Sequence, residues 1–589
     1  MKELSPERRA LLAGLLSLLV IIIWSMIYKP PAPPKPSPQH AGTETAGRPA
    51  TAAGQPLASV AAPGPSAIPA RAASEERTIV VESHLYRIEL SNRGAAVRSW
   101  QLKKYTDDHK PPRTLDVVHP DATQAVGWPF SLALDDPQLE AQANSGLYVV
   151  TLAEPRLAAG VPDKTVSYEL APPLTPLTPP TELHFMWSDG RLAVIKHLKF
   201  DPSYVVEMET SVQLDGKPLV HGVAWRGGFG DTTVYMPAEQ VQVFFSSGGK
   251  LQMLPYKKLG DPNQPAQRLH RPGTFGYVGI EDRYFAAAFL PRAATSAGVA
   301  LWDWRLDVDI EQDGKTVKEP VAEMAARETS PGPLALRVFV GPKDLDELKK
   351  LNPPLTDLVQ FGWLEIIAAP LFYLLRWLHG YVPNYGWAII LMTVLINMLL
   401  FPLKVKSWRS MQKMQKVAPE IRAIQDRYKK YSLRDPRKQE MNKEVMAVYQ
   451  RENINPMGGC LPMVLQMPIW FALYRMLNVT IELRHAPWLG WIHDLSARDP
   501  YYILPVLMGV TMYAMQKMTP MTATDPAQQR MLNWTPLMFG AMFVIFPVSS
   551  GLVLYILASN LVNMAQQWYL NRSEPVAAKA PRGKEAKKR

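Results

Sequence analysis

The chain has 589 residues, a formal net charge of +11 and a single cysteine, Cys460. One cysteine excludes an intramolecular disulfide, and the sequence contains no Cys/His metal spacing, no P-loop and no GxSxG motif. These absences argue against a disulfide scaffold, a Cys/His metal site, a P-loop nucleotide-binding protein and a hydrolase with a GxSxG nucleophile.

An apolar run of the N-terminal region extends from Leu11 to Tyr28 and follows Arg8 and Arg9. The run is long for a signal peptide and no A-x-A-like cleavage site follows directly, which favours a retained membrane anchor at residues 1–28 over the alternative, a cleaved signal. Residues 29–77 are rich in Pro, Ala and Gly, as in KPPAPPKPSP, and predict a disordered tether.

Residues 78–345 consist of short apolar runs separated by Gly, Pro, Asn and Asp. Stretches such as YVVEMETSVQL and LALRVFVG have the period of two that is typical of strands, and helical candidates are few. The pattern predicts an all-β sandwich. The histidines of this region show no metal-ligand spacing and are expected to be structural or at the surface: His84, His109, His119, His184, His197, His221 and His270.

Membrane character resumes after the β region. Residues 359–381 combine aromatic and apolar residues with charged ones and predict an amphipathic helix in the membrane interface. Apolar segments predict transmembrane helices at 386–403, 460–480, 501–518, 531–546 and 549–570. With the anchor, the predicted fold is a membrane α-helical bundle of six transmembrane helices, five forming the core, plus a large extracytoplasmic all-β domain.

Positive charge is concentrated in two stretches. Residues 404–455 hold 14 Lys and Arg against 6 Asp and Glu, and residues 571–589 hold 7 against 2. Both border predicted spans, so the positive-inside rule explains them better than a nucleic-acid-binding domain. The rule places both stretches and both termini in the cytoplasm. Ribosomal RNA and anionic lipid stay open as contacts of the basic tail 571–589.

Polar residues interrupt the predicted spans. Thr393 and Asn397 are four residues apart and share one helix face, and Lys404 lies seven residues further along that face. Three more polar residues lie on two other spans: Gln466, Asn560 and Asn563. Because lipid cannot satisfy polar groups, these residues predict a hydrated groove nearer the cytosolic side. Hydrogen bonds that hold the helices together explain the same pattern equally well.

The basic segment 404–455 predicts a cytoplasmic hairpin of two helices joined at SLRDPRK. Its methionines suit a surface that accepts varied apolar partners, or they simply hold the hairpin together. They are Met411, Met414, Met441 and Met446.

Three stretches carry a resemblance to a known family: NPMGGCLPMVLQMPIWFALY (455–474), HAPWLGWIHDLSARDPYYILPVLMGVTM (485–512) and FPVSSGLVLYILASNLVNMAQQWY (546–569). Over about 364–570 the chain resembles the YidC/Oxa1/Alb3 family of membrane protein insertases, and most of all its Gram-negative six-span type. The resemblance implies an inner-membrane insertase and chaperone that works alone and with the Sec translocon. It implies a groove open to cytosol and lipid, and an outer domain with a supersandwich fold.

The resemblance also implies roles for individual residues. The client-contacting slide corresponds to Met467, Pro468, Ile469 and Trp470 on one span and to Tyr555 on the last. Thr393 matches a groove threonine. Asn397 departs from the family, which usually has Arg or Lys there, and Lys404 is a possible substitute at the groove mouth.

The implied partners are nascent membrane proteins, the ribosome, SecYEG and SecDF, and the lipid bilayer, without DNA. Catalytic residues, cofactors and a metal are not expected. One alternative is a membrane-tethered periplasmic carbohydrate-binding or carbohydrate-active protein, for which no convincing carboxylate pair is found. A solute transporter is the other, and neither internal repeats nor broken helices support it.

Overall fold

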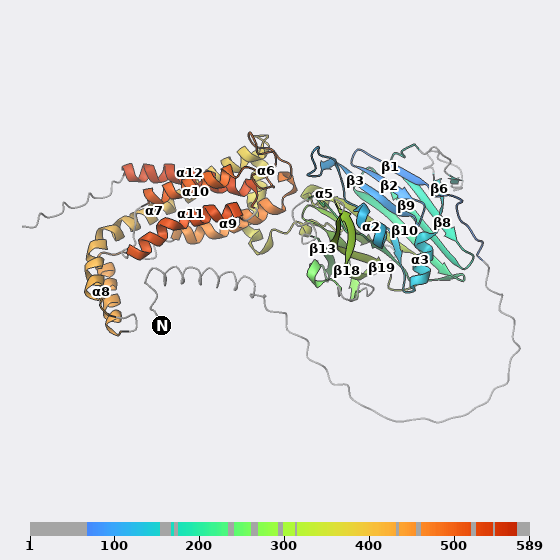
Figure 1. Ribbon diagram of the computed structural model, residues 1–589, viewed down its shortest axis with the longest axis horizontal. Helices are drawn as coiled ribbons and strands as arrows, with labels where there is room; N and C mark the ends of the chain where they lie inside the picture. The colour runs from blue at the N-terminus through green and yellow to red at the C-terminus, as the bar shows by residue number, and fades with distance from the viewer. Residues whose placement is uncertain are drawn as a thin grey trace, which may run out of the picture. The chain divides into compact units, whose positions relative to one another are not determined.

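The computed structural model describes residues 68–153, 167–169, 175–233, 241–260, 269–292, 298–312, 315–431, 435–454, 461–519, 526–545 and 548–573. The predicted anchor, most of the predicted tether and the predicted tail beyond residue 573 lie outside these residues. The chain divides into two compact units (Figure 1): a β unit of residues 62–360 with 479–482, and a helical unit that contains the rest.

The described strands of the β unit form three sheets, and every ladder between them is antiparallel. The first sheet has the order β1 (Thr78–Glu82), β2 (Tyr86–Ser91), β3 (Ala96–Thr106), β4 (Thr114–Asp116). The largest has the order β14 (Lys250–Pro255), β13 (Gln242–Ser247), β16 (Val278–Glu281), β17 (Phe285–Pro291), β20 (Leu334–Pro342), β10 (Val205–Leu214), β9 (Leu192–Phe200), β8 (Thr181–Ser188), β6 (Val149–Ala153), β7 (Ser167–Glu169), with β11 (Lys217–Pro218) beside β10.

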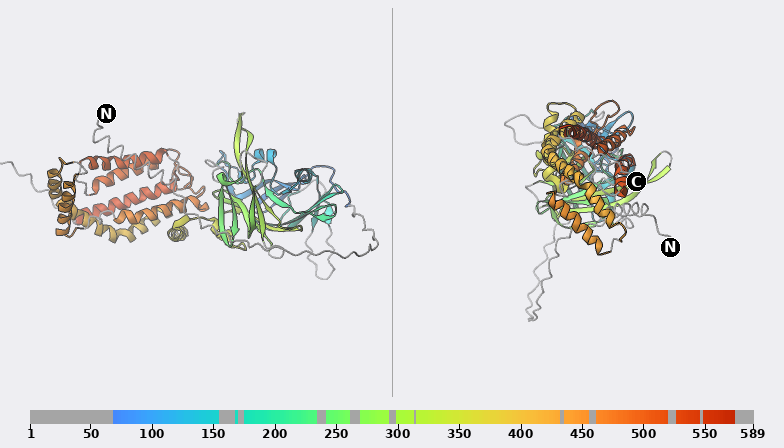
Figure 2. Two further views of the ribbon diagram at one scale, coloured as in Figure 1. Left: turned by 90° about the horizontal axis from the view of Figure 1, so that it is seen from below. Right: turned by 90° about the vertical axis from the view of Figure 1, so that its left-hand side faces the viewer.

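The third sheet has the order β15 (Leu269–Phe275), β18 (Val299–Gln312), β19 (Lys315–Arg327), β12 (Gly222–Trp225), β5 (Ser131–Ala133). β18 and β19 pair from Ala300 opposite Arg327 to Gln312 opposite Lys315. In Figure 2 this pair extends as a long two-stranded ribbon beyond the rest of its sheet.

Three short α-helices interrupt the strands in the described part of this unit: α2 (Pro120–Val126), α3 (Pro137–Ser145) and α5 (Leu345–Lys349). The side chain of Asp136 caps α3 by accepting hydrogen bonds from the backbone N–H groups of Gln138 and Leu139. The described residues also form two 3₁₀ turns, η1 (Tyr256–Lys258) and η2 (Thr356–Leu358). The unit is therefore β-rich rather than all-β. The sequence analysis missed these helices because segments of five to nine residues are too short for periodicity to reveal.

Residues of β9 alternate between the core and the outer face, as a strand covered on one side requires. Its inward residues include Val194 and Leu198, which are fully buried. Aromatic rings fill the adjoining core, where Phe130 meets Trp100 edge-on at 5.8 Å and Trp225 at 6.5 Å between ring centroids.

Lys196 also points inward from β9 and is fully buried. Its Nζ donates hydrogen bonds to the carbonyl oxygens of Gly94 and Phe130, both at 2.7 Å, and of Ala95 at 3.2 Å. Burial lowers the pKa of Lys196 to about 7, and the nearby charge of Arg226 acts in the same direction. This amine fastens the largest sheet to backbone that precedes β3 and β5.

A 3₁₀ turn, η5 (Ile481–Leu483), runs from the segment 479–482 of the β unit into the helical unit. The described part of the helical unit begins with another such turn, η3 (Gly362–Leu364). Its described α-helices are α6 (Glu365–His379), α7 (Tyr385–Arg427), α8 (Arg437–Arg451), α9 (Leu461–Val479), α10 (Ile503–Met518), α11 (Pro526–Ile545) and α12 (Ser550–Ser573). α7 packs against α6, α8 and α12, and α10 packs against α11 and α12 (Figure 1).

α7 joins two segments that the sequence analysis treats separately, the span 386–403 and the first arm of the hairpin. It is one helix of 43 residues, although it contains Pro402 and Pro419. At 1.5 Å per residue it is about 64 Å long, roughly twice the hydrocarbon thickness of a bilayer. Among the described helices it is the one that meets a length and hydropathy criterion for crossing a membrane. The count of six spans stays a prediction.

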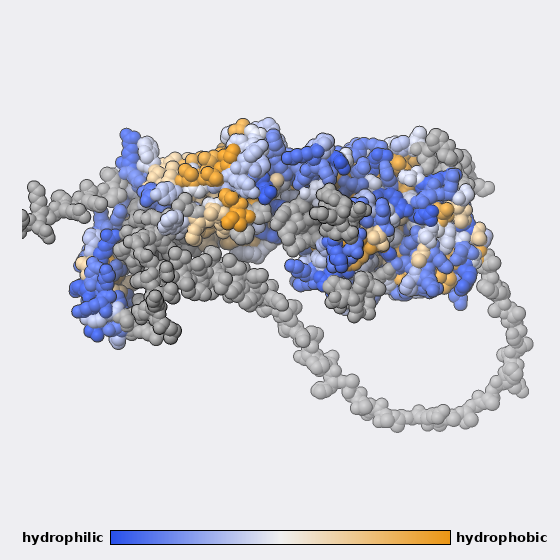
Figure 3. Space-filling view, viewed as in Figure 1, coloured by the Kyte–Doolittle hydropathy of each residue, from blue (hydrophilic) through white to orange (hydrophobic). Residues whose placement is uncertain are grey.

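α6 occupies the range of the predicted interface helix. Phe372 and Leu375 on one face are buried, whereas Ile366 is 85% exposed and Trp377 is 57% exposed. In Figure 3 further hydrophobic side chains gather on the helical unit, over the faces of α10 and α12, while the visible face of the β unit is mostly hydrophilic. An exposed apolar surface of this kind suits lipid.

Small residues allow α10 and α11 to approach closely. A Cβ added at Gly509 of α10 would lie 3.5 Å from the Cα of Gly540 on α11. Contacts between glycines are typical of helix pairs in membranes, where van der Waals packing replaces the hydrophobic effect as the driving force.

α8 lies against the C-terminal part of α7, as both views of Figure 2 show. Their apolar residues form a small core of their own, which contains Val417, Ile421, Ile424, Val448 and Ile454. Salt bridges from Arg427 to Glu444 at 2.7 Å and from Arg451 to Glu420 at 2.7 Å join the two helices at the surface.

Candidate functional site

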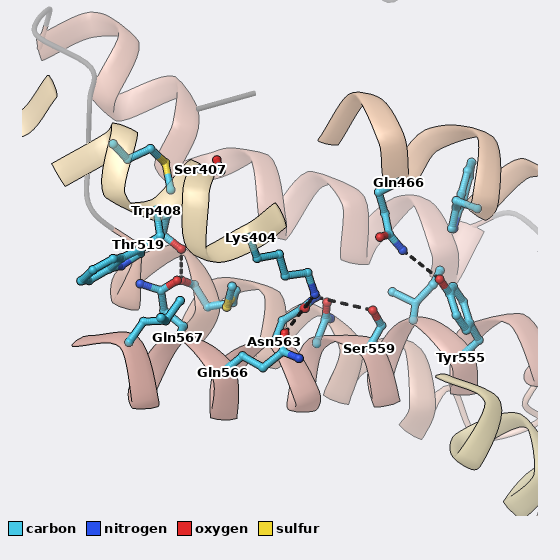
Figure 4. A pocket seen from close by; sticks show the side chains of 16 residues that line it. Lys404, Ser407, Trp408, Gln466, Thr519, Tyr555, Ser559, Asn563, Gln566 and Gln567 are labelled. Atoms are coloured by element: carbon cyan, nitrogen blue, oxygen red, sulfur yellow. Dashed lines mark hydrogen bonds between the residues drawn. The ribbon is translucent and has the colours of Figure 1, made fainter. Parts of the chain in front are cut away.

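A cavity of about 410 Å³ lies within the helical unit, between α7, α9, α10 and α12. Its lining is mostly polar on α12, as Figure 4 shows, and includes aromatic residues on α7, α9 and α12. The lining residues are Lys404, Ser407, Trp408, Met411, Gln466, Trp470, Met515, Thr519, Tyr555, Ile556, Ser559, Asn560, Asn563, Gln566, Gln567 and Leu570. All but one of the polar residues among these are neutral.

The exception is Lys404, whose side chain points toward α12 (Figure 4). Its Nζ donates hydrogen bonds to Oδ1 of Asn397 at 2.7 Å, to Oδ1 of Asn563 and to Oε1 of Gln566 at 3.1 Å. All three acceptors are neutral amides. Among the described residues no carboxylate forms a salt bridge with this ammonium, so its positive charge is solvated but not neutralised.

Thr393 and Asn397 do not line the cavity. Both are fully buried between α7 and α12. The hydroxyl of Thr393 donates to the backbone oxygen of Ile389 at 2.7 Å, one turn back on its own helix. Nδ2 of Asn397 donates to the backbone oxygen of Thr393 at 2.8 Å and to the hydroxyl of Ser559 at 3.3 Å. These two residues therefore lie beneath the lining of the cavity, where Asn397 contacts the lining residue Ser559.

Gln466 and Tyr555 close one end of the cavity. Nε2 of Gln466 on α9 donates to the hydroxyl of Tyr555 on α12 at 2.9 Å (Figure 4). Tyr555 is 1% exposed. Asn560 contributes on another side, where its Nδ2 donates to the hydroxyl of Thr511 on α10 at 3.2 Å. Three helices are thus joined by side-chain amides at the cavity.

Several lining residues were not among the predicted site residues, notably Ser559, Gln566 and Gln567. The sequence does contain a pattern that indicates two of them, because Ser559, Asn563 and Gln566 have the i, i+4, i+7 spacing of one helix face. Gln567 Nε2 donates to Oδ1 of Asn571 at 2.9 Å, which extends this polar face toward the end of α12.

Four of the five predicted slide residues lie on α9, beside the cavity, and the fifth, Tyr555, lies on α12. Met467 is 48% exposed, whereas Pro468, Ile469 and Trp470 are partly buried. Trp470 both lines the cavity and stacks with Tyr474, at 6.5 Å between ring centroids. The exposed residues Leu465 and Phe471 belong to the same helix. α9 therefore presents apolar side chains to the outside and one aromatic ring to the polar interior.

The four methionines of the predicted hairpin have different surroundings. Met414 and Met441 pack against the core between α7 and α8, as the alternative interpretation expects. Met446 is 47% exposed on α8. Met411 lines the cavity. Among these residues, Met446 and Met411 are the ones available to a partner.

Sequence comparisons cover nearly the whole chain. Residues 78–374 match the YidC periplasmic domain family, and residues 377–577 match the 60Kd inner membrane protein family. The membrane protein insertase YidC of Syntrophus aciditrophicus is 32% identical over 96% of this chain and 99% of its own length. This chain belongs to the YidC family of membrane protein insertases. The YidC of Geobacter metallireducens, at 33% identity over 96% of this chain and 98% of its own, agrees.

Membership of the YidC family decides between the hypotheses from the sequence. The chain is an inner-membrane insertase with a periplasmic domain, and its substrates are nascent membrane proteins. It is not an enzyme, so the carbohydrate-active alternative is wrong. A crystal structure of an active YidC insertase aligns with 86% of this chain and with 95% of the crystallised chain, at 18% identity and with a TM-score of 0.34.

Proposed function

We propose that the cavity between α7, α9, α10 and α12 is the groove that receives the polar flank of a client, and that Lys404 supplies its positive charge. The observation that carries this proposal is the hydrogen bonding of the Lys404 ammonium to neutral amide oxygens of Asn397 and Gln566 at 2.7 and 3.1 Å. An ammonium without a carboxylate partner attracts an acidic side chain more strongly than a neutralised pair does.

The groove lowers the cost of moving polar residues through the bilayer. A charged residue at the centre of a membrane helix costs about 2.5 to 3.5 kcal/mol on insertion scales, because lipid offers no hydrogen bonds. The hydroxyls and amides of α12, including Ser559 and Asn563, replace part of the lost hydration. The client's apolar segment gains about 0.3 to 0.6 kcal/mol for each Leu, Ile, Phe or Val, so partitioning supplies the energy.

The apolar segment would leave along α9 and α12, the helices that carry the proposed slide. Support comes from the exposed side chains of Met467 on α9 and Leu561 on α12, at 48% and 52% exposure. Trp470 and Tyr555 lie where the polar lining meets this apolar surface. Thr393 belongs to the proposal as a buried support.

We propose further that α7 and α8 form a cytoplasmic ribosome-binding hairpin, with both chain termini on that side and six spans in all. Support comes from exposed cations on α7, Lys413, Lys416 and Arg422, and from the exposed side chain of Met446. The basic tail is a second proposed ribosome contact. The chain would act alone on small clients and with SecYEG and SecDF on larger ones.

Site-specific photocrosslinking to a stalled nascent membrane protein tests the groove. A photoreactive residue at Asn563 or Trp470 is expected to capture the client. Leu399 of α7 provides the matched control, because it is 81% exposed and outside the cavity lining. Capture at Leu399 without capture at Asn563 would show that the client passes the helical unit by another route.

A further inference from the structure

The outer face of the largest periplasmic sheet carries a group of potential metal ligands. β8 and β9 are adjacent antiparallel strands, and His184 lies directly opposite His197. Glu182 precedes His184 by two residues and therefore points to the same face. The alternation that buries Lys196 in the core places its neighbour His197 on the outside.

The three side chains already lie close together. The imidazole rings of His184 and His197 are stacked, with centroids 4.1 Å apart and planes at 4°. Nε2 of His197 is 3.3 Å from Oε2 of Glu182. One potential ligand atom from each residue lies within 4.8 Å of those from the other two, and all three residues are partly exposed. An ion from solvent can therefore reach them.

Two imidazole nitrogens and one carboxylate oxygen are a ligand set that zinc accepts. Ligand atoms about 2.0 to 2.1 Å from a tetrahedral zinc ion lie roughly 3.3 Å apart, so the ligand atoms would move closer together and the stacked rings would tilt until their nitrogen lone pairs meet at one ion. A neutral imidazole offers a nitrogen lone pair to a metal.

A further polar group lies beside the three residues. Thr151 on β6 lies opposite His184, is 5% exposed, and its hydroxyl has no hydrogen-bond partner among the described residues. A hydroxyl in that position can accept a hydrogen bond from a metal-bound water. On the other side, Glu209 of β10 lies opposite His197, and Lys199 is 3.5 Å from Oε1 of Glu182.

We propose that Glu182, His184 and His197 bind one zinc ion, with water in the fourth position. The ligands come from two strands, so the ion would join β8 to β9 on the outer face of the periplasmic domain. The competing explanation is a stacked histidine pair beside a salt bridge between Lys199 and Glu182. The two explanations differ in whether Lys199 is a structural partner or a competitor of the metal.

The test uses the full-length chain, purified in detergent, freed of metal with a chelator and titrated with zinc chloride by calorimetry. One zinc ion per chain is expected to bind. His184→Gln and His197→Gln are each expected to weaken binding by about tenfold or more. His84→Gln is the matched control, because His84 is an exposed histidine of the same unit, and it should bind zinc as the parent chain does.

Lys199→Met separates the two explanations, since it removes a cation that competes for Glu182. Tighter zinc binding by this variant supports the site. Absence of stoichiometric binding by the parent chain, or equal binding by the parent, His184→Gln and His197→Gln, would overturn the proposal. Thermal unfolding of each variant without zinc checks that it is folded. The groove proposal is independent of either result.

Discussion

The ammonium of Lys404 lies 2.7 Å from Oδ1 of Asn397, although the two residues are seven positions apart on α7. Side chains on a helix tilt toward its N-terminus, and an extended lysine reaches a little more than one turn, so its ammonium meets the side-chain amide of Asn397. The charge of Lys404 therefore reaches the position where the resemblance leads one to expect a basic residue. In the function proposed above, the chain keeps a cation at this point of the groove and supplies it from elsewhere on the helix.

Replacing Lys404 with methionine should impair insertion of clients with acidic flanks. A hydrogen bond to a charged group contributes about 1.5 to 3 kcal/mol, so binding of an acidic flank should weaken by about tenfold or more. The measurement is the protease-protected fraction of a client with an acidic tail, compared with a neutral-tailed client. Lys406→Met is the control, because Lys406 is exposed on the same helix. An equal loss with both clients would contradict a role in charge recognition.

Moving the charge should restore function. In the double variant Asn397→Arg with Lys404→Met, the cation is carried at position 397, and insertion of the acidic client should return toward the parent level. Asn397→Arg alone places two cations side by side in a buried network, and we expect it to lower stability in thermal unfolding. If the double variant inserts the acidic client no better than Lys404→Met alone, the two positions are not interchangeable.

Tyr555 should matter more through its ring than through its hydroxyl. Tyr555→Phe removes the hydrogen bond from Gln466, which contributes about 1 kcal/mol, and insertion should stay close to the parent level. Tyr555→Ala removes a buried ring, and a loss of about 3 to 5 kcal/mol in the free energy of unfolding is expected. Thermal unfolding in detergent measures the loss of stability caused by each substitution. Equal destabilisation by the two substitutions would assign the effect to the hydrogen bond.

Gly386 should not tolerate a side chain. A Cβ at this position of α7 would lie 2.1 Å from Cδ1 of Trp488, so Gly386→Ala should destabilise the helical unit by about 1 to 3 kcal/mol. The matched control is Gly509→Ala, whose Cβ would have its nearest neighbour at 3.5 Å and should cost less. The temperature of unfolding in detergent distinguishes the two, and similar values for both variants would show that the loop around Trp488 adjusts freely.

Glu328 should make the stability of the periplasmic domain depend on pH. Burial raises the pKa of Glu328 to about 8, and burial lowers the pKa of its neighbour His221 to about 4. The histidine is almost entirely neutral in both the folded and unfolded states only above about pH 7.5, but a substitution of Glu328 leaves it in place, so its contribution cancels when the parent chain is compared with such a variant. Above about pH 6.5 the unfolded carboxyl is ionised while the folded one holds its proton, so stability falls as pH rises toward 8.

The variant Glu328→Gln isolates this contribution, because it cannot titrate. From pH 6.5 to 8 the free energy of unfolding of the parent chain should fall relative to that of Glu328→Gln, by at most about 1.4 kcal/mol per pH unit. Thermal unfolding across this range measures it. A constant difference would show that the carboxyl is already ionised in the folded domain.

Local periodicity in the sequence predicts much of this architecture. The alternation in 204–214 corresponds to β10, and the polar spacing of Thr393 and Asn397 correctly indicates one helix face. Periodicity does not tell how far a polar residue lies from the surface of a cavity. Thr393 and Asn397 are fully buried, so cysteines placed there would not report on access of water to the groove. Ser559 and Asn563 are the better positions for that experiment.

Long-range register is the other feature that the sequence conceals. The pairing of His184 with His197 depends on how β8 aligns with β9, and neither residue has a ligand spacing along the chain. In the same way, the reach of Lys404 depends on the side chains of α12 that meet it, 159 and 162 residues away. Such contacts follow from tertiary packing and not from any pattern in one segment.

The continuity of α7 has a mechanical consequence. From Lys404 to Arg427 the helix continues for 24 residues, about 35 Å, with Pro419 inside it. Proline within a helix removes a backbone hydrogen bond and favours a kink, so a push on the far end of α7 would reach Lys404 through Pro419. Docking of a large particle on the hairpin and rearrangement of the groove would then be linked through this one position of the helix.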